Sequence, residues 1–213
     1  MGEERASLFS GRALRCVRGE RLVFDRLDFD LPAAGALLLT GPNGSGKSSL
    51  LRLMTGLLKA AAGDILWQGK AIGDDLEAHH GRLHYVGHAD ALKAVLTASE
   101  NLAFWTGLAG TVEAGAVRRG LDALGIAALA DLPCRFLSAG QKRRVGLARL
   151  AARPARLWLL DEPTTALDQG AIDRLRHLIA EHRAGGGMVV AATHSDLGLA
   201  DAQVLDLART RST

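Results

Sequence analysis

Residues 41–48 constrain this chain more than any other stretch, because they read Gly-Pro-Asn-Gly-Ser-Gly-Lys-Ser. They match the phosphate-binding pattern G-x-x-x-x-G-K-[ST] at every position. A short apolar run at 36–40 favours a buried strand before the loop, and residues 49–55 favour a helix after it. Since strand, loop and helix are the context this pattern requires, we interpret the loop as a phosphate site; a glycine-rich turn is the alternative.

Each residue type in this loop has a chemical role in binding phosphate or Mg²⁺. Glycines let successive backbone N–H groups turn toward phosphate oxygens, and the following helix N-terminus adds partial positive charge. Lys47 carries a full charge for the β- and γ-phosphates, and the Ser48 hydroxyl suits Mg²⁺. The expected nucleotide-binding residues here are Gly41, Pro42, Asn43, Gly44, Ser45, Gly46, Lys47, Ser48 and Ser49.

Composition narrows the class of protein. The 213 residues are 48% hydrophobic and 23% charged, ordinary for a globular chain of one large domain. The net charge of +3 is too small to indicate nucleic-acid binding by itself. Cys16 and Cys134 lack metal-like spacing, so a reduced cytosolic protein is expected. No apolar run approaches the roughly 18 residues of a membrane span, and residues 1–5 do not resemble a signal peptide.

Strand and helix patterns alternate along the chain. Strands are expected at 13–17, 22–30, 36–40, 64–67, 83–86, 156–160, 188–193 and 204–207. Helices are expected at 47–56, 97–107, 111–125, 138–152, 170–184 and 195–200, with Thr97, Thr111 and Ser138 as caps. The pattern predicts an α/β fold with a mixed, mainly parallel sheet and an N-terminal antiparallel part. It also predicts one domain, in which a helical subdomain (90–152) is inserted between core segments 1–89 and 153–213.

Two further stretches carry candidate chemistry. The apolar strand at 157–160 ends in Asp161 and Glu162, where Asp161 suits Mg²⁺ and Glu162 suits orienting or deprotonating a water molecule. Solvated acids at a strand end are the alternative. Residues 137–141 read Leu-Ser-Ala-Gly-Gln, in which Ser138 and Gln141 form a capping box. Gly140 is a poor helix former, and its small size permits an anion to approach the helix N-terminus.

Together these motifs resemble the ATP-binding-cassette (ABC) ATPase family in order and spacing. The set is residues 41–48, residues 137–141, Asp161 with Glu162, residues 166–168 and His194. The resemblance implies that ATP and Mg²⁺ are bound, with Ser48 and Asp161 holding the metal ion, and that ATP is hydrolysed. Lys47, Glu162 and His194 are then the catalytic group, His194 contacting the γ-phosphate. Ser138, Gly140 and Gln141 would face the ATP of a second copy, and Asp168 would lie at that dimer interface.

Two positions depart from the family pattern. Where the family has a glutamine after the strand matched by 83–86, this chain has Ala89, with His88 and Asp90 as candidate replacements. Where the family often has an adenine-stacking aromatic, residues 16–19 contain none, although the plane of Arg18 can stack on a base.

Within the family the chain is most similar to the ATPase subunits of haem exporters in bacterial cytochrome c biogenesis. This similarity is carried by residues 65–69, 85–88, 92–93, 96–97, 100–102, 104–105 and 137–150. It implies a homodimer with ATP at its interface, bound through integral membrane permease subunits to the cytoplasmic face of the inner membrane, with no nucleic-acid partner. The alternatives are an ABC transporter with another cargo, a non-transport ABC ATPase, and a nucleotide kinase, in which Ser138 and His194 have no role.

Two clusters have ordinary interpretations. Four histidines at 79, 80, 84 and 88 lie on a loop and a short strand, which do not bring four ligands together, so neither a metal nor a haem site is expected. Five basic residues follow the capping box: Lys142, Arg143, Arg144, Arg149 and Arg153. We expect them to form a solvated helix face rather than a nucleic-acid site.

Overall fold

The computed structural model describes residues 7–108 and 113–208, whose strands form two sheets. An antiparallel sheet has the order β2-β1-β4-β5, and a parallel sheet has the order β6-β7-β8-β3-β9. The antiparallel sheet contains β1 (Ser7–Arg18), β2 (Arg21–Pro32), β4 (Ala62–Trp67) and β5 (Lys70–Ala71). The parallel sheet contains β3 (Ala36–Thr40), β6 (Leu83–Val86), β7 (Leu157–Asp161), β8 (Met188–Ala192) and β9 (Gln203–Asp206).

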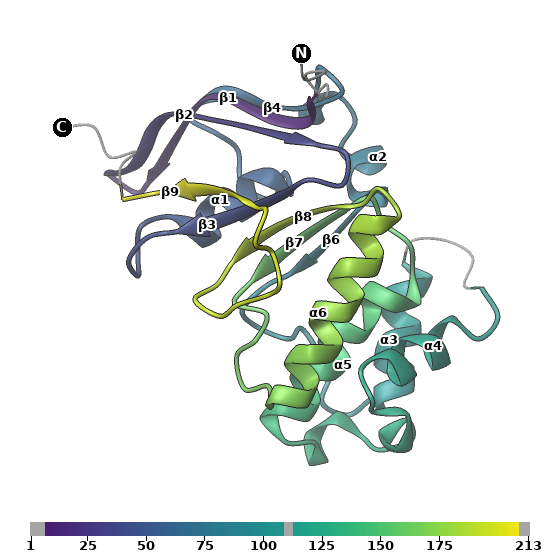
Figure 1. Cartoon of the computed structure of the whole chain (residues 1–213). Coiled ribbons are helices and arrows are strands. Elements are labelled where there is room, and N and C mark those ends of the chain that lie inside the picture. Colours follow the sequence, from purple (N-terminus) through teal and green to yellow (C-terminus); the bar gives the residue numbers. More distant parts are fainter. Residues whose placement is uncertain (1–6, 109–112, 209–213) are drawn as a thin grey trace.

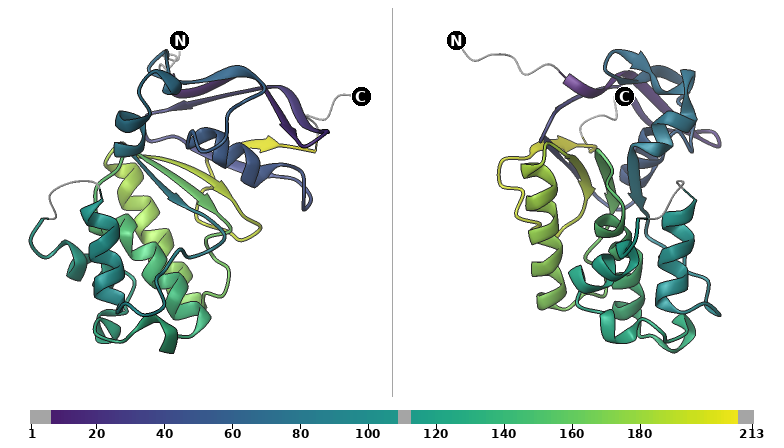
Figure 2. Two further views of the ribbon diagram at one scale, coloured as in Figure 1. Left: turned by 180° about the vertical axis from the view of Figure 1, so that it is seen from behind. Right: turned by 90° about the vertical axis from the view of Figure 1, so that its right-hand side faces the viewer.

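Helices cover both faces of the parallel sheet (Figures 1 and 2). They are α1 (Lys47–Met54), α2 (Leu76–Gly81), α3 (Ala98–Gly107), α4 (Ala116–Ala123), α5 (Ala139–Ala152) and α6 (Gln169–Ala184). Single 3₁₀ turns are η1 (Ile72–Asp74), η2 (Ala127–Leu129) and η3 (Cys134–Phe136). In the described part of the chain, no helix is both long and apolar enough to span a membrane.

The apolar core has two parts, one on each side of the parallel sheet. One part joins the antiparallel sheet to α1 and the near face of the parallel sheet, so α1 is held between the two sheets (Figure 1). The other part joins the far face of the parallel sheet to α3, α4, α5 and α6. Because β7 and β8 are buried along their whole length, they read as continuous apolar runs in the sequence.

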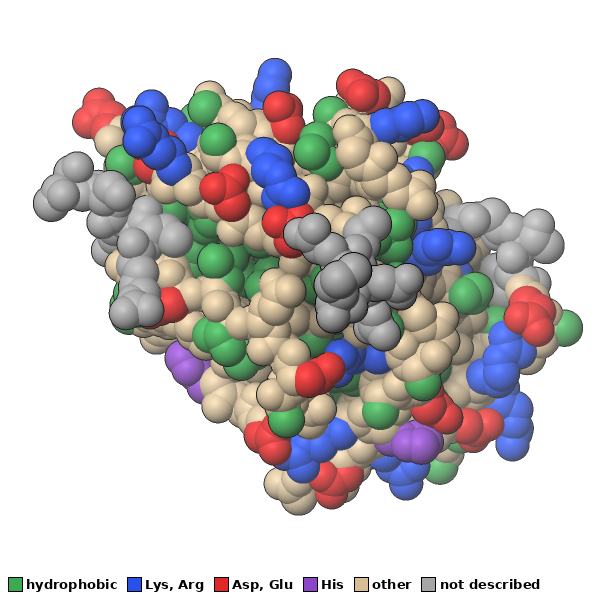
Figure 3. All heavy atoms as spheres, turned by 45° about the horizontal axis from the view of Figure 1, so that its top comes forward, with side chains coloured by type: hydrophobic (Ala, Val, Ile, Leu, Met, Phe, Trp, Pro, Cys, Tyr) green, Lys and Arg blue, Asp and Glu red, His purple; other side chains and the backbone are tan. Residues whose placement is uncertain are grey.

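The outer face of the antiparallel sheet is solvated. Acidic and basic side chains are interspersed in the view from that side (Figure 3). Arg12 pairs with Asp30 and Arg15 with Asp25 across β1 and β2. The alternation of buried and exposed residues along β2 shows that only its inner face contributes to the core.

The α/β class is confirmed, with the antiparallel strands gathered in a sheet of their own. The predicted strands all form, and the capping boxes of Thr97 with Glu100 and of Ser138 with Gln141 are both present. β5, α2 and the 3₁₀ turns were not predicted. The predicted cap at Thr111 and residues 1–5 lie outside the described residues.

Two predictions were wrong. The stretch 195–200 is a loop rather than a helix, because the Asp196 side chain accepts a hydrogen bond from Gly198 N and Gly198 has a left-handed φ of 71°. The basic residues of α5 do not form a solvated face. Arg143 is only 3% exposed, and the other four are half-buried, because α5 packs between the sheet and the neighbouring helices.

Candidate nucleotide-binding site

The phosphate-binding loop connects β3 to α1 and depends on its glycines. Gly46, at the N-cap of α1, has a φ of 109°, which only glycine adopts readily. A Cβ there would lie 2.5 Å from Val23 Cγ1 of β2. The loop therefore lies close to the antiparallel sheet, and its backbone conformation requires the glycine that the sequence pattern supplies.

Lys47 and Ser45 show what this loop is suited to bind. Lys47 is 8% exposed, and its ammonium donates to the carbonyls of Gly41 (2.7 Å) and Pro42 (3.3 Å). The Ser45 hydroxyl is buried and has no hydrogen-bond partner within the described structure. The N-terminus of α1 has no side-chain cap. A cation, a buried hydroxyl and an uncapped helix start fit a polyphosphate, whose oxygens are acceptors.

Strand register brings the predicted acids to the same edge of the sheet as the loop. Asp161 of β7 pairs with Ala192 of β8, which pairs with Leu39 of β3. Asp161 therefore lies level with Leu39, at a distance of two strand spacings of roughly 4.8 Å each. Asp161 is 4% exposed, so its carboxylate is shielded from bulk water.

Glu162 and His194 lie together just beyond this edge. The Glu162 amide donates to Ala192 O at 2.8 Å, and Glu162 has a left-handed φ of 47°, unusual for a residue with a side chain. His194 Nε2 lies 3.9 Å from Glu162 Oε1. The Glu162 side chain is 28% exposed and that of His194 68%, so both remain open to a ligand from solvent.

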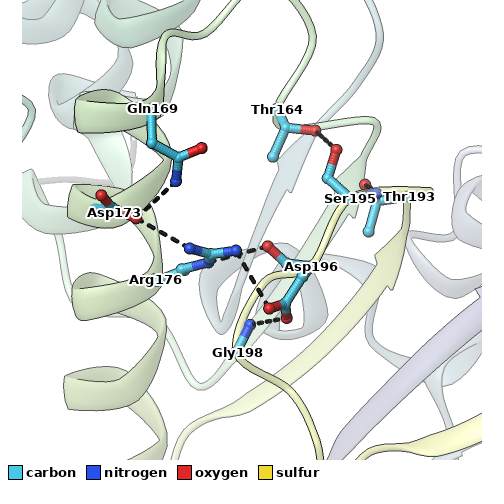
Figure 4. A network of polar contacts seen from close by, with 8 residues as sticks. All are labelled: Thr164, Gln169, Asp173, Arg176, Thr193, Ser195, Asp196 and Gly198. Carbon is cyan, nitrogen blue, oxygen red and sulfur yellow. Dashed lines mark hydrogen bonds and ion pairs between the residues drawn. The ribbon is translucent and has the colours of Figure 1, made fainter.

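The loop that carries His194 is fixed on both sides (Figure 4). Before it, Thr193 Oγ1 accepts from Ser195 N, and the Ser195 hydroxyl is bonded to that of Thr164 at 2.9 Å. After it, Arg176 of α6 donates to the carbonyl and carboxylate of Asp196. This network joins the His194 loop to α6 and to the segment after Glu162.

The donor set also fits a divalent cation that shares its coordination with phosphate. Ser48 is exposed at the start of α1, and Asp161 offers a carboxylate. Among residues 7–108 and 113–208 no group of three or more His, Cys, Asp or Glu side chains is arranged to hold a metal ion. Mg²⁺ prefers oxygen ligands and commonly takes one or two from protein and the rest from phosphate and water.

The signature segment, residues 137–141, lies on the other side of the parallel sheet from the phosphate loop. Ser138 is exposed; its hydroxyl accepts from Gln141 N at 3.2 Å, and its amide donates to Gln141 Oε1 at 2.8 Å. A Cβ on Gly140 would lie 2.5 Å from Ala166 O, so this glycine is needed for packing within the chain. Asp168 caps α6 by accepting from Ala171 N. These residues do not contact the phosphate loop of their own chain.

The two departures from the family pattern are visible in the structure. His88 and Ala89 are exposed in the loop after β6, whereas Asp90 is paired with Arg143 at 3.1 Å. Arg18 is exposed at the end of β1, beside the turn to β2.

The four clustered histidines serve different elements. His79 Nε2 is bonded to Met54 O, and His80 Nε2 to Thr55 O, which ties α2 to the end of α1. His84 Nε2 is bonded to Arg153 O, and burial lowers the pKa of His84 to about 3. Since His88 is exposed on a separate loop, the four rings face different partners.

Arg143 was missed as a site residue by sequence reasoning. It donates to the carbonyls of Asp161 and Glu162, directly behind the predicted catalytic acids. A signal was present, because Arg143 shares the helix positions i, i+4 and i+7 with Leu147 and Leu150, both buried. A basic residue on an apolar stripe points inward rather than to solvent.

Comparison with known proteins identifies the family of this chain. A family model described as "ABC transporter" matches residues 24–165. The cytochrome c biogenesis ATP-binding export protein CcmA of Rhodospirillum rubrum is 60% identical over 204 residues, covering 96% of this chain and 87% of that protein. The CcmA of Paramagnetospirillum magneticum is 56% identical, covering 94% of each.

Solved structures show the same fold. A putative ABC transporter ATP-binding protein from Pyrococcus furiosus superposes with a TM-score of 0.81 at 23% identity, covering 96% of this chain and 99% of that one. The ATP-binding subunit of another ABC transporter gives a TM-score of 0.79 at 24% identity, covering 88% and 80%. The chain therefore belongs to the ABC transporter family, as one of its ATP-binding, ATP-hydrolysing proteins.

Proposed function

We propose that this protein is the ATP-hydrolysing subunit of an exporter that serves cytochrome c biogenesis, with haem as its cargo. The observation that carries this proposal is the 60% identity to the Rhodospirillum rubrum export protein across nearly the whole chain. The protein would act on integral membrane permease subunits at the cytoplasmic face of the inner membrane. No part of the proposal requires binding to nucleic acid.

The catalytic roles follow from chemistry at the sheet edge. Lys47 and the loop amides bind the β- and γ-phosphates, while Ser48 and Asp161 hold Mg²⁺, which offsets phosphate charge. Glu162 orients the attacking water and accepts its proton. His194 contacts the γ-phosphate, and its 3.9 Å separation from Glu162 supports a shared site for the two side chains.

Assembly would complete the site. The phosphate loop supplies one side of the nucleotide, and the exposed start of α5 suits the other side when it comes from a second copy. In this arrangement residues 90–152 act as a helical subdomain that presents Ser138, Gly140 and Gln141 to the partner's ATP. Asp168 would lie at the same interface. The result is a homodimer with two ATP molecules buried between its chains.

Complementation tests the cellular function. We expect this chain, expressed in Rhodospirillum rubrum lacking its own CcmA, to restore covalent haem attachment to c-type cytochromes, measured by haem staining of membrane fractions after denaturing electrophoresis. The Lys47→Ala variant, expressed to the same level, should restore none. If the unaltered chain hydrolyses ATP but leaves the cytochromes without haem, the ATPase serves a different cargo.

A further inference from the structure

Arg143 lies at the junction of three segments close to the proposed catalytic acids. Its Nε donates to Pro163 O at 3.2 Å, and its Nη2 donates to Asp161 O at 3.0 Å and Glu162 O at 2.8 Å. Its Nη1 donates to Gly87 O at 2.8 Å and to Asp90 Oδ1 at 3.1 Å. One side chain of α5 thus joins the loop after β6 to the segment after β7.

Every N–H of this guanidinium has an acceptor. Arginine has five such donors in a rigid plane, and five acceptors are present, four of them backbone carbonyls. The Arg143 side chain is only 4% exposed, so water cannot replace a lost partner. Because a buried unpaired donor is costly, neither loop can move away from Arg143 without the other being affected.

The bond to Glu162 O has a particular consequence. Glu162 has the left-handed φ of 47°, which persists in a residue with a side chain only where its surroundings hold it. The amide of Glu162 donates to Ala192 O, and its carbonyl accepts from Arg143 at 2.8 Å and from Thr165 N at 3.3 Å. These bonds fix the peptide groups on both sides of the residue whose carboxylate lies beside His194, and the shorter bond to the carbonyl comes from Arg143.

We propose that Arg143 is a positioning residue for ATP hydrolysis, holding Glu162 in its left-handed conformation and coupling that conformation to the loop at 87–90. The proposal rests on the role assigned to Glu162 under the proposed function. In this chain the loop after β6 has Ala89 where the family has a glutamine, and its link to the acids runs through Asp90 and Arg143 instead. Displacement of the loop is then felt at the general base through one guanidinium.

The test separates turnover from nucleotide binding. Arg143→Lys keeps the charge but offers three donors from a single point, which cannot reach acceptors on both loops. We expect kcat to fall about 10- to 100-fold, the scale of a misplaced catalytic group, while KM for ATP changes less than about 2-fold. Asp90→Ala removes one of the two bonds between Arg143 and this loop, leaving the bond to Gly87 O, and should lower kcat by a smaller factor. The double variant should be no slower than Arg143→Lys alone, because both changes break one link.

A control comes from the residue that follows α5. Arg153 donates to two carbonyls, Gly81 O and Leu83 O, at the opposite end of β6. Arg153→Lys should keep the wild-type kcat although it loses similar hydrogen bonds. Thermal unfolding of each variant reports whether it is folded, and Asp90→Ala carries the test alone if Arg143→Lys does not fold.

Glu162→Gln in the same assay distinguishes a wrong role for Glu162 from a wrong positioning role for Arg143. If Glu162→Gln turns over ATP normally, the role of Glu162 is wrong and the positioning proposal falls with it. If Glu162→Gln loses turnover while folded Arg143→Lys and Asp90→Ala keep the wild-type kcat, only the positioning proposal is overturned. An equal loss of kcat in Arg153→Lys would also overturn it, because the effect would then be general destabilisation.

Discussion

Two helix N-termini in this protein are expected to bind ATP, yet they are built in opposite ways. Helix α1 begins at Gly46 with no side-chain cap. Helix α5 is preceded by Ser138, and a reciprocal capping box with Gln141 satisfies the amides of Ser138 and Gln141. One helix start is open and the other is closed by its own side chains.

Their surroundings differ in the same sense. The start of α1 lies between two sheets, with Lys47 held against the carbonyls of Gly41 and Pro42. The start of α5 is exposed at Ser138, and Gly140 lies close to Ala166 O.

The difference indicates an order of events. The first amides of a helix need partners, and an uncapped start leaves them for an anion. Helix α1 can therefore bind phosphate in a single chain, whereas an anion at α5 must compete with bonds already made. We expect ATP to bind the phosphate loop first and to engage α5 only when a second chain brings the two together.

The largest expected effect comes from a change at the open helix start, that of α1. Lys47→Ala removes the cation from the phosphate loop, so ATP binding should weaken and hydrolysis should fall below detection. Lys142→Ala removes the same charge near the start of α5 and should keep turnover within about 2-fold, since the half-buried Lys142 side chain makes no hydrogen bond or ion pair with the described residues. Turnover in each variant, with binding of a fluorescent ATP analogue, measures the difference. Equal losses would remove the distinction between the two helix starts.

The second prediction tests the closed end through assembly. Glu162→Gln should hydrolyse ATP roughly 10²-fold more slowly and so accumulate an ATP-bound dimer. Adding Ser138→Arg should prevent that dimer through bulk and a misplaced charge, while ATP still binds the phosphate loop. Light scattering with and without Mg-ATP gives the mass of each variant. A dimer of the double variant would mean that Ser138 is only a helix cap.

The third prediction concerns Gly140. In Gly140→Ala the added Cβ would lie 2.5 Å from Ala166 O. Such overpacking lowers the unfolding free energy by about 1–3 kcal/mol. Gly170→Ala is the control, because its nearest neighbour, Asp168 Oδ1, is 3.7 Å away at the start of α6. Urea unfolding should show a loss for Gly140→Ala and none for the control. Similar stability of the two variants would place the requirement for Gly140 in nucleotide binding alone.

Local patterns were enough to predict most of this fold. The phosphate loop, both capping boxes and the strand ending in Asp161 each depend on residues within a few positions of one another, and all of these elements form. The register that aligns Asp161 with Ala192 and Leu39 follows from parallel strands ending at one edge.

Long-range contacts were the part that could not be predicted. Arg143 finds its partners 18 to 56 residues away in the chain, so the local stripe with Leu147 and Leu150 indicates that it points inward but not which atoms it contacts. Gly140 has a similar explanation, because the atom that excludes a side chain belongs to Ala166. The loop at 195–200 has long-range support of the same kind, because Arg176 of α6 donates to Asp196.

The smallest expected effect measures the cap itself. Without nucleotide, Ser138→Ala removes a side-chain acceptor from the amide of Gln141, and losses of this kind are about 1 kcal/mol. Ser48→Ala, in the first turn of the uncapped α1, should change the unfolding free energy by less than about 0.5 kcal/mol. Urea unfolding of the nucleotide-free variants gives both values. If ATP replaces the cap, Ser138→Ala should act on the ATP-bound Glu162→Gln dimer by weakening dimerisation rather than by destabilising the monomer. The protein concentration at which half of the chains are dimeric should then be higher. A loss at Ser48 as large as at Ser138 would show that the two helix starts are equally closed, and the order of events inferred from them would fail.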